Sequence, residues 1–300
     1  MKSYPKKILS VQQQIQHFKD AGLAISSDSE AENALCSIGF YRLRGYLCHL
    51  YDKDNKKYSA GAKLSDVIAL YDFDSELSHI LFSFLSRIEI ALRARFISAL
   101  LTTTNDALSW LDPSEFHNKK IFWQNLGVIA SEIARSKDAF IKHNYDKHEG
   151  LIPLWAAVEV TSFGTLSKLI KNMRTDRAFI YLAQSYKFRS EKGKTLTPSH
   201  NLFSSWTHAC SVFRNICAHN GRLCNRNFSV LPQLLNTDKK DYEPRGLYSI
   251  ILSMKYLRPS DDSWVSFVNE MKNLFASYEG KFDLSYISFR EDWEKYLRIM

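Results

Sequence analysis

The residues best suited to chemistry stand together in one stretch, residues 213–222, which read FRNICAHNGR. An imidazole titrates near neutral pH, so His219 can move a proton to or from a ribose 2′-hydroxyl or a 5′-oxygen leaving group. The Arg214 guanidinium can hold a phosphate with paired hydrogen bonds and stabilise its developing charge, and Asn215 can orient either group. These residue types suit metal-independent RNA cleavage to a cyclic phosphate by Arg214, Asn215 and His219, with no cofactor, and a solvated Arg–His pair is the alternative.

The spacing of Arg214 and His219 limits how they can share a substrate. Five residues on an ideal helix correspond to about 140° of rotation, so the two side chains do not face the same point. Either the last helical turn is distorted near Gly221, or two copies of the chain place their motifs opposite each other across a two-fold axis. Both arrangements stay open, and both give Asn220 and Arg222 a supporting position.

Basic residues gather around this stretch. The chain carries 40 basic and 32 acidic residues, a formal net charge of +8, which favours partners that bear phosphates. Between residues 187 and 226 there are seven basic residues and one acid, Glu191. A solvated surface would explain this pattern too. We predict RNA contacts from five of the basic residues: Lys187, Arg189, Lys192, Lys194 and Arg226.

A second segment, Tyr41-Arg42-Leu43-Arg44, also joins aromatic and basic residues. Arg42 and Arg44 are predicted to bind RNA, because guanidinium groups and stacked aromatic rings are typical of single-strand binding. A structural role for the segment, with Tyr41 in the core, fits equally well.

Two acids stand inside apolar helical patterns. Glu89 can pair with Arg93 one turn on, which is a local ion pair worth little. Glu159 has no basic residue three or four positions away. We expect it to reach Arg214 from a neighbouring helix and hold the guanidinium in place, the alternative being an exposed helix face.

Apolar residues recur at spacings of three and four along most of the chain, which predicts an all-α helical bundle. No Pro or Gly interrupts residues 63–101. An unbroken helix there would be roughly 55 Å long, and a kinked or split helix is the alternative. Residues 154–170 are expected to form a second core helix that Gly164 can bend.

A third core helix should carry the motif. Thr197 is its expected N-cap, Pro198 its first residue and Gly221 its C-terminal stop. The preceding residues, 187–198, are expected to form a polar, basic loop beside the motif. The bundle is divided into a helical segment over 1–62, a core over 63–230 and a helical segment over 231–300.

Cysteines and apolar runs indicate the compartment. The five cysteines form no CxxC pair, no signal pattern opens the chain, and no apolar run approaches the ~20 residues of a membrane span. A cytoplasmic protein without a membrane partner is expected. Cys210, Cys217 and Cys224, with His208 and His219 nearby, could be imagined as a metal site, but buried apolar cysteine is the ordinary explanation, and no metal is predicted.

Several motifs occur together in a fixed order. They are residues 9–15 (LSVQQQI), 38–46 (IGFYRLRGY), 70–74 (LYDFD), 87–93 (RIEIALR), 153–160 (PLWAAVEV), 162–167 (SFGTLS) and 214–219 (RNICAH), with Arg222, Asn225 and Arg226. On these motifs the chain resembles the abortive-infection (Abi) family of the AbiD/AbiF type, bacterial phage-defence proteins, over about residues 5–228. The resemblance implies a HEPN-type helical fold with N- and C-terminal helical extensions. It also gives Arg214, Asn215 and His219 the motif roles of a dimeric ribonuclease toxin with a small non-coding RNA partner.

The chain departs from the family pattern at two positions. Asn220 stands where members often carry a second His, and Cys224 where they carry Trp. A single motif imidazole per chain makes a homodimer more necessary.

Three functions are compatible with these observations. The first is a phage-defence endoribonuclease, held in check by a partner RNA. The second is an RNA-binding module without chemistry, and the third is a protein-interaction component that uses apolar helix faces.

Overall fold

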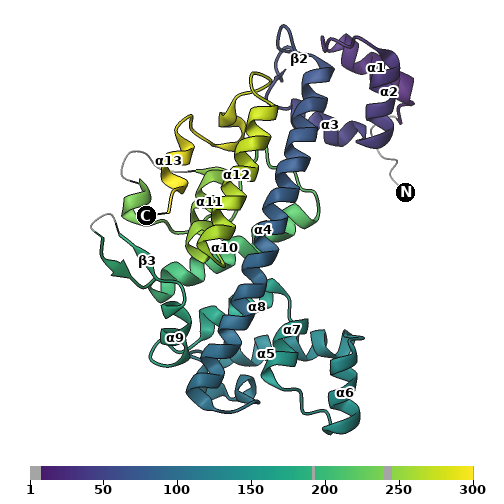
Figure 1. The fold of residues 1–300 in the computed structure, drawn as a ribbon. Coiled ribbons are helices and arrows are strands. Elements are labelled where there is room, and N and C mark those ends of the chain that lie inside the picture. Colours follow the sequence, from purple (N-terminus) through teal and green to yellow (C-terminus); the bar gives the residue numbers. More distant parts are fainter. Residues whose placement is uncertain (1–7, 191–192, 240–244, 300) are drawn as a thin grey trace.

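The computed structural model describes residues 8–190, 193–239 and 245–299, and within these ranges it holds thirteen α-helices and two short β-hairpins. The all-α prediction is confirmed. Figure 1 shows one long helix, α4, running through the molecule with the other helices along its sides. The N-terminal elements are α1 (Val11–Asp20), α2 (Asp28–Ser37), α3 (Phe40–Leu47), β1 (Tyr51–Asp52) and β2 (Lys57–Tyr58).

The long helix α4 (Leu64–Thr104) is continuous over 41 residues, roughly 60 Å at the usual rise per residue. It confirms the unbroken helix predicted from the absence of Pro and Gly. Side chains such as Leu77, Leu81 and Phe96 are fully buried along it. Asn105 then ends the helix in a left-handed conformation, which suits Asn better than most side chains.

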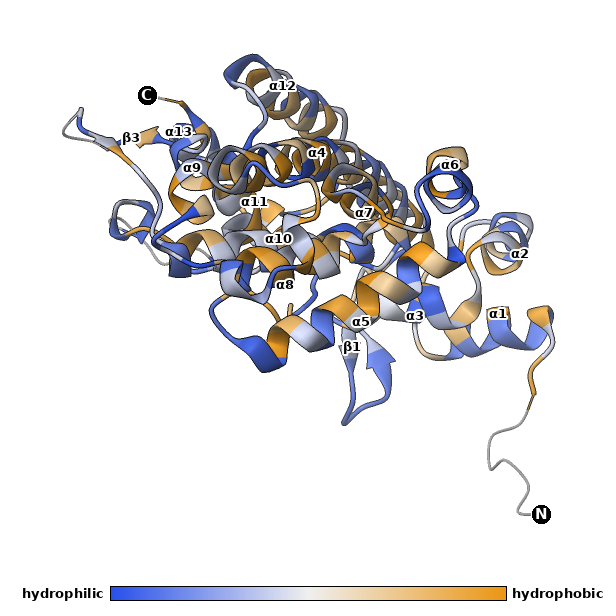
Figure 2. Cartoon of the chain, turned by 90° about the horizontal axis from the view of Figure 1, so that it is seen from below, coloured by the Kyte–Doolittle hydropathy of each residue, from blue (hydrophilic) through white to orange (hydrophobic). Residues whose placement is uncertain are grey.

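The remaining helices pack around α4 and α10 (His200–Ala218). They are α5 (Lys119–Arg135), α6 (Ala139–Lys147), α7 (Leu154–Val160), α8 (Phe163–Asn172), α9 (Ala178–Gln184), α11 (Gly246–Leu257), α12 (Asp261–Ser277) and α13 (Trp293–Leu297). α10 contacts α4, α8 and α11, while α12, α9, α7 and α3 contact α4 directly. Outer helices such as α5 carry both hydrophilic and hydrophobic residues along their length (Figure 2).

Two predicted helix boundaries are wrong. The expected helix over 154–170 is two helices, because the Ser162 hydroxyl accepts the Thr165 N–H and begins α8 anew. Gly164 therefore lies in the first turn of α8 and does not bend a longer helix. The motif helix α10 is capped by Ser199, whose hydroxyl accepts from Leu202, instead of by Thr197.

The predicted polar loop is in part a hairpin. β3 (Phe188–Arg189) pairs with antiparallel β4 (Thr195–Leu196). Two-residue strands have too few residues to show an alternating pattern, so the sequence does not predict them.

Buried apolar side chains from Ile15 to Leu297 form one continuous cluster. This core includes residues of all three predicted segments. The division at residues 62 and 230 stays a prediction. Within the described ranges, no helix has both the length and the apolar character that crossing a membrane requires.

Candidate functional site

The motif lies at the C-terminal end of α10, which ends at Ala218, and His219 is its C-cap, with a φ of −98° and a ψ of 17°. The His219 N–H still donates to the Asn215 carbonyl at 3.1 Å. The distortion comes one residue later, at Asn220, whose φ is +47°. Both predicted arrangements, a distorted turn within one chain and two copies facing each other, stay predictions.

Asn220 and Gly221 form the C-terminal cap of α10. Its N–H donates to the Cys217 carbonyl and the Gly221 N–H to the Ile216 carbonyl, a hydrogen-bond pattern that satisfies the last free carbonyls of a helix. Asn tolerates the left-handed conformation that this cap needs. Gly221 is needed because a Cβ there would stand 3.1 Å from the Ile216 carbonyl oxygen.

Arg214 is held by Glu89 of α4. Its Nε and Nη2 donate to Glu89 Oε2 at 3.1 and 2.8 Å, and its Nη1 donates to Asn215 Oδ1 at 3.1 Å. The side chain of Arg214 is 29% exposed. A guanidinium has five N–H donors, and three serve contacts among the described residues, so two remain for a ligand.

Glu89 also holds a second guanidinium. Its Oε1 accepts from Arg93, and Arg93 donates further to the carbonyls of Val158 and Glu159 at the end of α7. Because Glu89 is only 6% exposed, this pair of contacts ties α4, α7 and α10 together behind the motif. The carboxylate is shared by two cations, so the cluster keeps a net positive charge.

The predicted role of Glu159 is wrong. Glu159 is exposed on α7, and Arg214 is bound by Glu89 instead. The sequence alone pointed to Arg93 as the local partner of Glu89, which is correct but incomplete.

The predicted RNA-binding segment of α3 lies against the end of α10. Arg42 donates to the Asn220 carbonyl, 178 residues away in sequence. A groove of about 460 Å³ opens beside this contact, lined by Tyr41, Arg42, Arg44, Gly45, Tyr46 and Arg222. Tyr41 is 92% exposed, so its expected alternative place in the core is wrong. Three guanidinium groups therefore line a groove, and one of them, Arg222, lies three residues after His219.

Asp74 of α4 fixes the loop that carries Arg222. The buried carboxylate accepts the N–H groups of Leu223 and Cys224, at distances of 3.0 and 2.6 Å, and the Tyr46 hydroxyl at 2.8 Å. Burial and this carboxylate raise the pKa of Tyr46 well above its usual value, which keeps the phenol protonated as a donor. With the chain so anchored, Arg222 donates to the carbonyls of Cys224 and Asn225.

The other predicted RNA-binding residues divide between the two ends of α10. Arg226 lies near the motif and donates to the Arg222 carbonyl. Lys187, Arg189 and Lys194 are exposed on or beside the β3–β4 hairpin at the start of α10, and Lys192 lies outside the described residues. α10 has 19 residues, so roughly 27 Å separate its two ends. The expected closeness of this basic segment to the motif is therefore wrong.

Sequence reasoning missed the position of His49. It lies just after α3, with its ring 4.6 Å from Tyr286. Partial burial, with a smaller contribution from Arg222, lowers the pKa of His49. A lone imidazole outside any motif carries no sequence signal for such a position.

The cysteines are five free thiols, of which Cys210, Cys217 and Cys224 are buried. Burial raises the pKa of Cys210 and Cys217 to about 12, so these thiols stay protonated, as apolar core residues do. Over the described part of the chain, no group of three or more His, Cys, Asp or Glu side chains is placed to hold a metal ion.

Comparison with known proteins gives one match. The profile of a family described as Abi-like protein matches residues 33–225, which include α3, α4 and all of α10. The curated proteins and the solved structures contain no significant match.

Proposed function

The chain belongs to the Abi-like protein family, and from this premise we propose that it is a phage-defence protein that cleaves RNA without a metal ion. The observation that carries the proposal is the end of α10. There, the Arg214 guanidinium is held by a buried carboxylate, and the exposed imidazole of His219 follows five residues later. The next residues contribute Arg222 to a groove that is lined by three further guanidinium groups.

The chemistry follows from the groups themselves. The ribose 2′-oxygen attacks the phosphorus and loses its proton to a base, the bond to the 5′-oxygen breaks, and that oxygen takes up a proton. His219 serves as one of the two proton-transfer groups. Arg214 stabilises the charge on the phosphate with its two remaining N–H donors. The products are a 2′,3′-cyclic phosphate and a 5′-hydroxyl.

A homodimer supplies the missing proton-transfer group. Arg214 contacts Glu89, and on an ideal helix His219 would face about 140° away from it, which favours a phosphate held between two chains. Two motifs facing each other across a two-fold axis would provide two imidazoles and two guanidinium groups. A small non-coding RNA in the groove would then compete with the substrate and restrain the toxin in the cytoplasm.

A second candidate is RNA sensing without cleavage. The groove favours it, because Arg42, Arg44 and Arg222 with an exposed Tyr41 suffice to grip a single strand through phosphate contacts and base stacking.

The experiment that separates the two candidates is cleavage by the purified protein in EDTA. We expect RNA fragments ending in a 2′,3′-cyclic phosphate, identified by mass spectrometry, and no loss of rate on removal of divalent ions. Salt-sensitive RNA binding without any fragments would favour the sensing function.

Glu89 is expected to position Arg214. In Glu89→Gln, Arg93 and Arg214 lose the negative charge of the carboxylate that they share. We therefore expect the rate of RNA cleavage to fall roughly tenfold to a hundredfold, because Arg214 is misplaced. The free energy of unfolding should fall by about 1–3 kcal/mol. Glu159→Gln is the matched control and should change neither. Equal rates for the two variants in a single-turnover assay would contradict the role of Glu89.

A further inference from the structure

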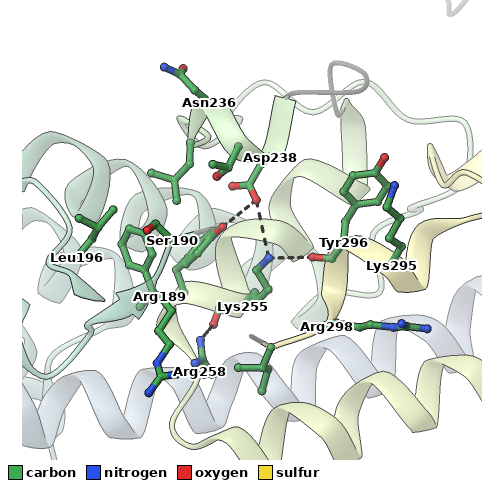
Figure 3. A pocket seen from close by; sticks show the side chains of 15 residues that line it. Arg189, Ser190, Leu196, Asn236, Asp238, Lys255, Arg258, Lys295, Tyr296 and Arg298 are labelled. Carbon is green, nitrogen blue, oxygen red and sulfur yellow. Dashed lines mark hydrogen bonds and ion pairs between the residues drawn. The ribbon is translucent and has the colours of Figure 1, made fainter. Parts of the chain in front are cut away.

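A second cavity lies beside the β3–β4 hairpin, which precedes the start of α10. Figure 3 shows the side chains that line it. It measures about 490 Å³, within the range of small-molecule sites. Its walls come from the β3–β4 hairpin, the turn η3 (Asn236–Lys239), α11 and residues 295–299. Most of this lining falls beyond residue 225, outside the family match.

The floor of the cavity holds a buried carboxylate with an unused oxygen. Asp238 is 6% exposed, and its Oδ1 accepts from the Tyr256 hydroxyl at 2.8 Å and lies 3.8 Å from Lys255 Nζ. Its Oδ2 is buried and has no hydrogen-bond partner among the described residues. A buried acceptor without a donor is costly, but this oxygen has almost no accessible surface, so a molecule in the cavity does not reach it.

Lys255 is already engaged and does not serve as the anion-binding group. It is 12% exposed and donates to the Tyr296 carbonyl at 2.8 Å (Figure 3). Burial lowers the pKa of Lys255 and raises that of Asp238. Lys255 and Asp238 carry opposite formal charges, so together they add no net charge to the floor.

The rim of the cavity is basic. Arg189 of β3 and Arg298 after α13 line it and are exposed. Arg258 also lines it, but donates to Asp261 at 2.6 Å and to the Lys255 carbonyl. The lining holds five basic residues, Arg189, Lys255, Arg258, Lys295 and Arg298, and one acid, Asp238, which gives a formal charge of +4. An anionic group is favoured at the rim.

The walls between floor and rim are apolar and aromatic. Phe188, Leu196 and Ile299 line them together with the Tyr256 ring. That ring is fixed by stacking on Trp206, with centroids 4.9 Å apart and an interplanar angle of 17°. Such walls fit a flat ring system.

We propose that this cavity binds a nucleoside phosphate, with the apolar walls enclosing the base and Arg189 on the basic rim holding the phosphate. The nucleoside phosphate is either a free nucleotide or one nucleotide of an RNA strand. The proposal does not require the chain to cleave RNA.

Calorimetric titration of the full chain tests it. The probes are the four ribonucleoside triphosphates, a 2′-O-methyl RNA hexamer that cannot be cleaved through a 2′-hydroxyl, and inorganic phosphate. We expect at least one triphosphate or the hexamer to bind with a Kd below about 1 mM. Binding of a triphosphate identifies a free nucleotide, and binding of the hexamer alone identifies an RNA nucleotide.

Matched variants assign the binding to this cavity. Arg189→Ala is expected to weaken it about tenfold, whereas Lys187→Ala, an exposed basic residue beside the same hairpin and outside the lining, should leave it unchanged. Three results would each overturn the proposal, whatever the outcome of the cleavage assay. They are the absence of binding, equal effects of Arg189→Ala and Lys187→Ala, and inorganic phosphate that binds as tightly as every nucleotide.

Discussion

Replacing His219 with alanine is expected to lower the rate of RNA cleavage by about 10²- to 10⁴-fold, the usual contribution of a positioned proton-transfer group. The side chain is exposed at the end of α10, so its removal should leave the melting temperature nearly unchanged. RNA binding should persist, because Arg42, Arg44 and Arg222 still line the groove. Single-turnover cleavage and filter binding measure the two effects separately.

His208→Ala is the matched control for this loss. His208 is an exposed imidazole on the same helix, eleven residues before His219. Partial burial and two nearby lysines lower its pKa, so it stays neutral at pH 7, and it has no place in the proposed chemistry. Unchanged cleavage by His219→Ala would remove the nuclease proposal and leave the groove as an RNA-binding surface. A similar loss in His208→Ala would point to a general effect on α10.

Local patterns predicted the helices well. The apolar spacing of three and four with no Pro or Gly was enough for α4, and the same pattern placed α10 around the motif. The boundaries failed where one hydroxyl decides between two residues, as with Ser199 in place of Thr197. A single cap hydrogen bond contributes only about 1 kcal/mol, so neighbouring candidates are nearly equal in sequence.

The site needed the tertiary structure. Glu89 and Glu159 carry similar sequence signals, as acids in apolar helical patterns, and only the packing of α4 against α10 shows that Glu89 contacts Arg214. The contact of Arg42 with Asn220 joins residues 178 positions apart, which no local spacing predicts. For Tyr41–Arg44 the residue types left a surface position and a core position of Tyr41 equally open, and the structure shows Tyr41 exposed.

Asp74 shows how such long-range contacts organise the site. Its carboxylate receives two backbone N–H groups from the loop after α10 and one hydroxyl from α3, so a single side chain of α4 aligns both elements that line the groove. Each donor is buried, so none can turn to water if the carboxylate is lost. The position of Arg222 therefore depends on a residue that does not itself touch the groove.

Asp74→Ala is accordingly expected to cost about 3–5 kcal/mol of unfolding free energy, because two backbone donors and the Tyr46 hydroxyl lose their acceptor in the core. Asp74→Asn should cost roughly 1–2 kcal/mol, since the amide oxygen still accepts both backbone N–H groups and the Tyr46 hydroxyl can accept from the amide nitrogen. The control is Asp72→Ala, on the exposed side of α4. Partial burial and Glu76 raise the pKa of Asp72, so its charge does not favour the folded state at pH 7, and its loss should change stability by less than about 0.5 kcal/mol. Urea unfolding followed by circular dichroism measures all three. Equal midpoints for Asp74→Ala and Asp72→Ala would show that the loop is held by other contacts and that the groove does not depend on Asp74.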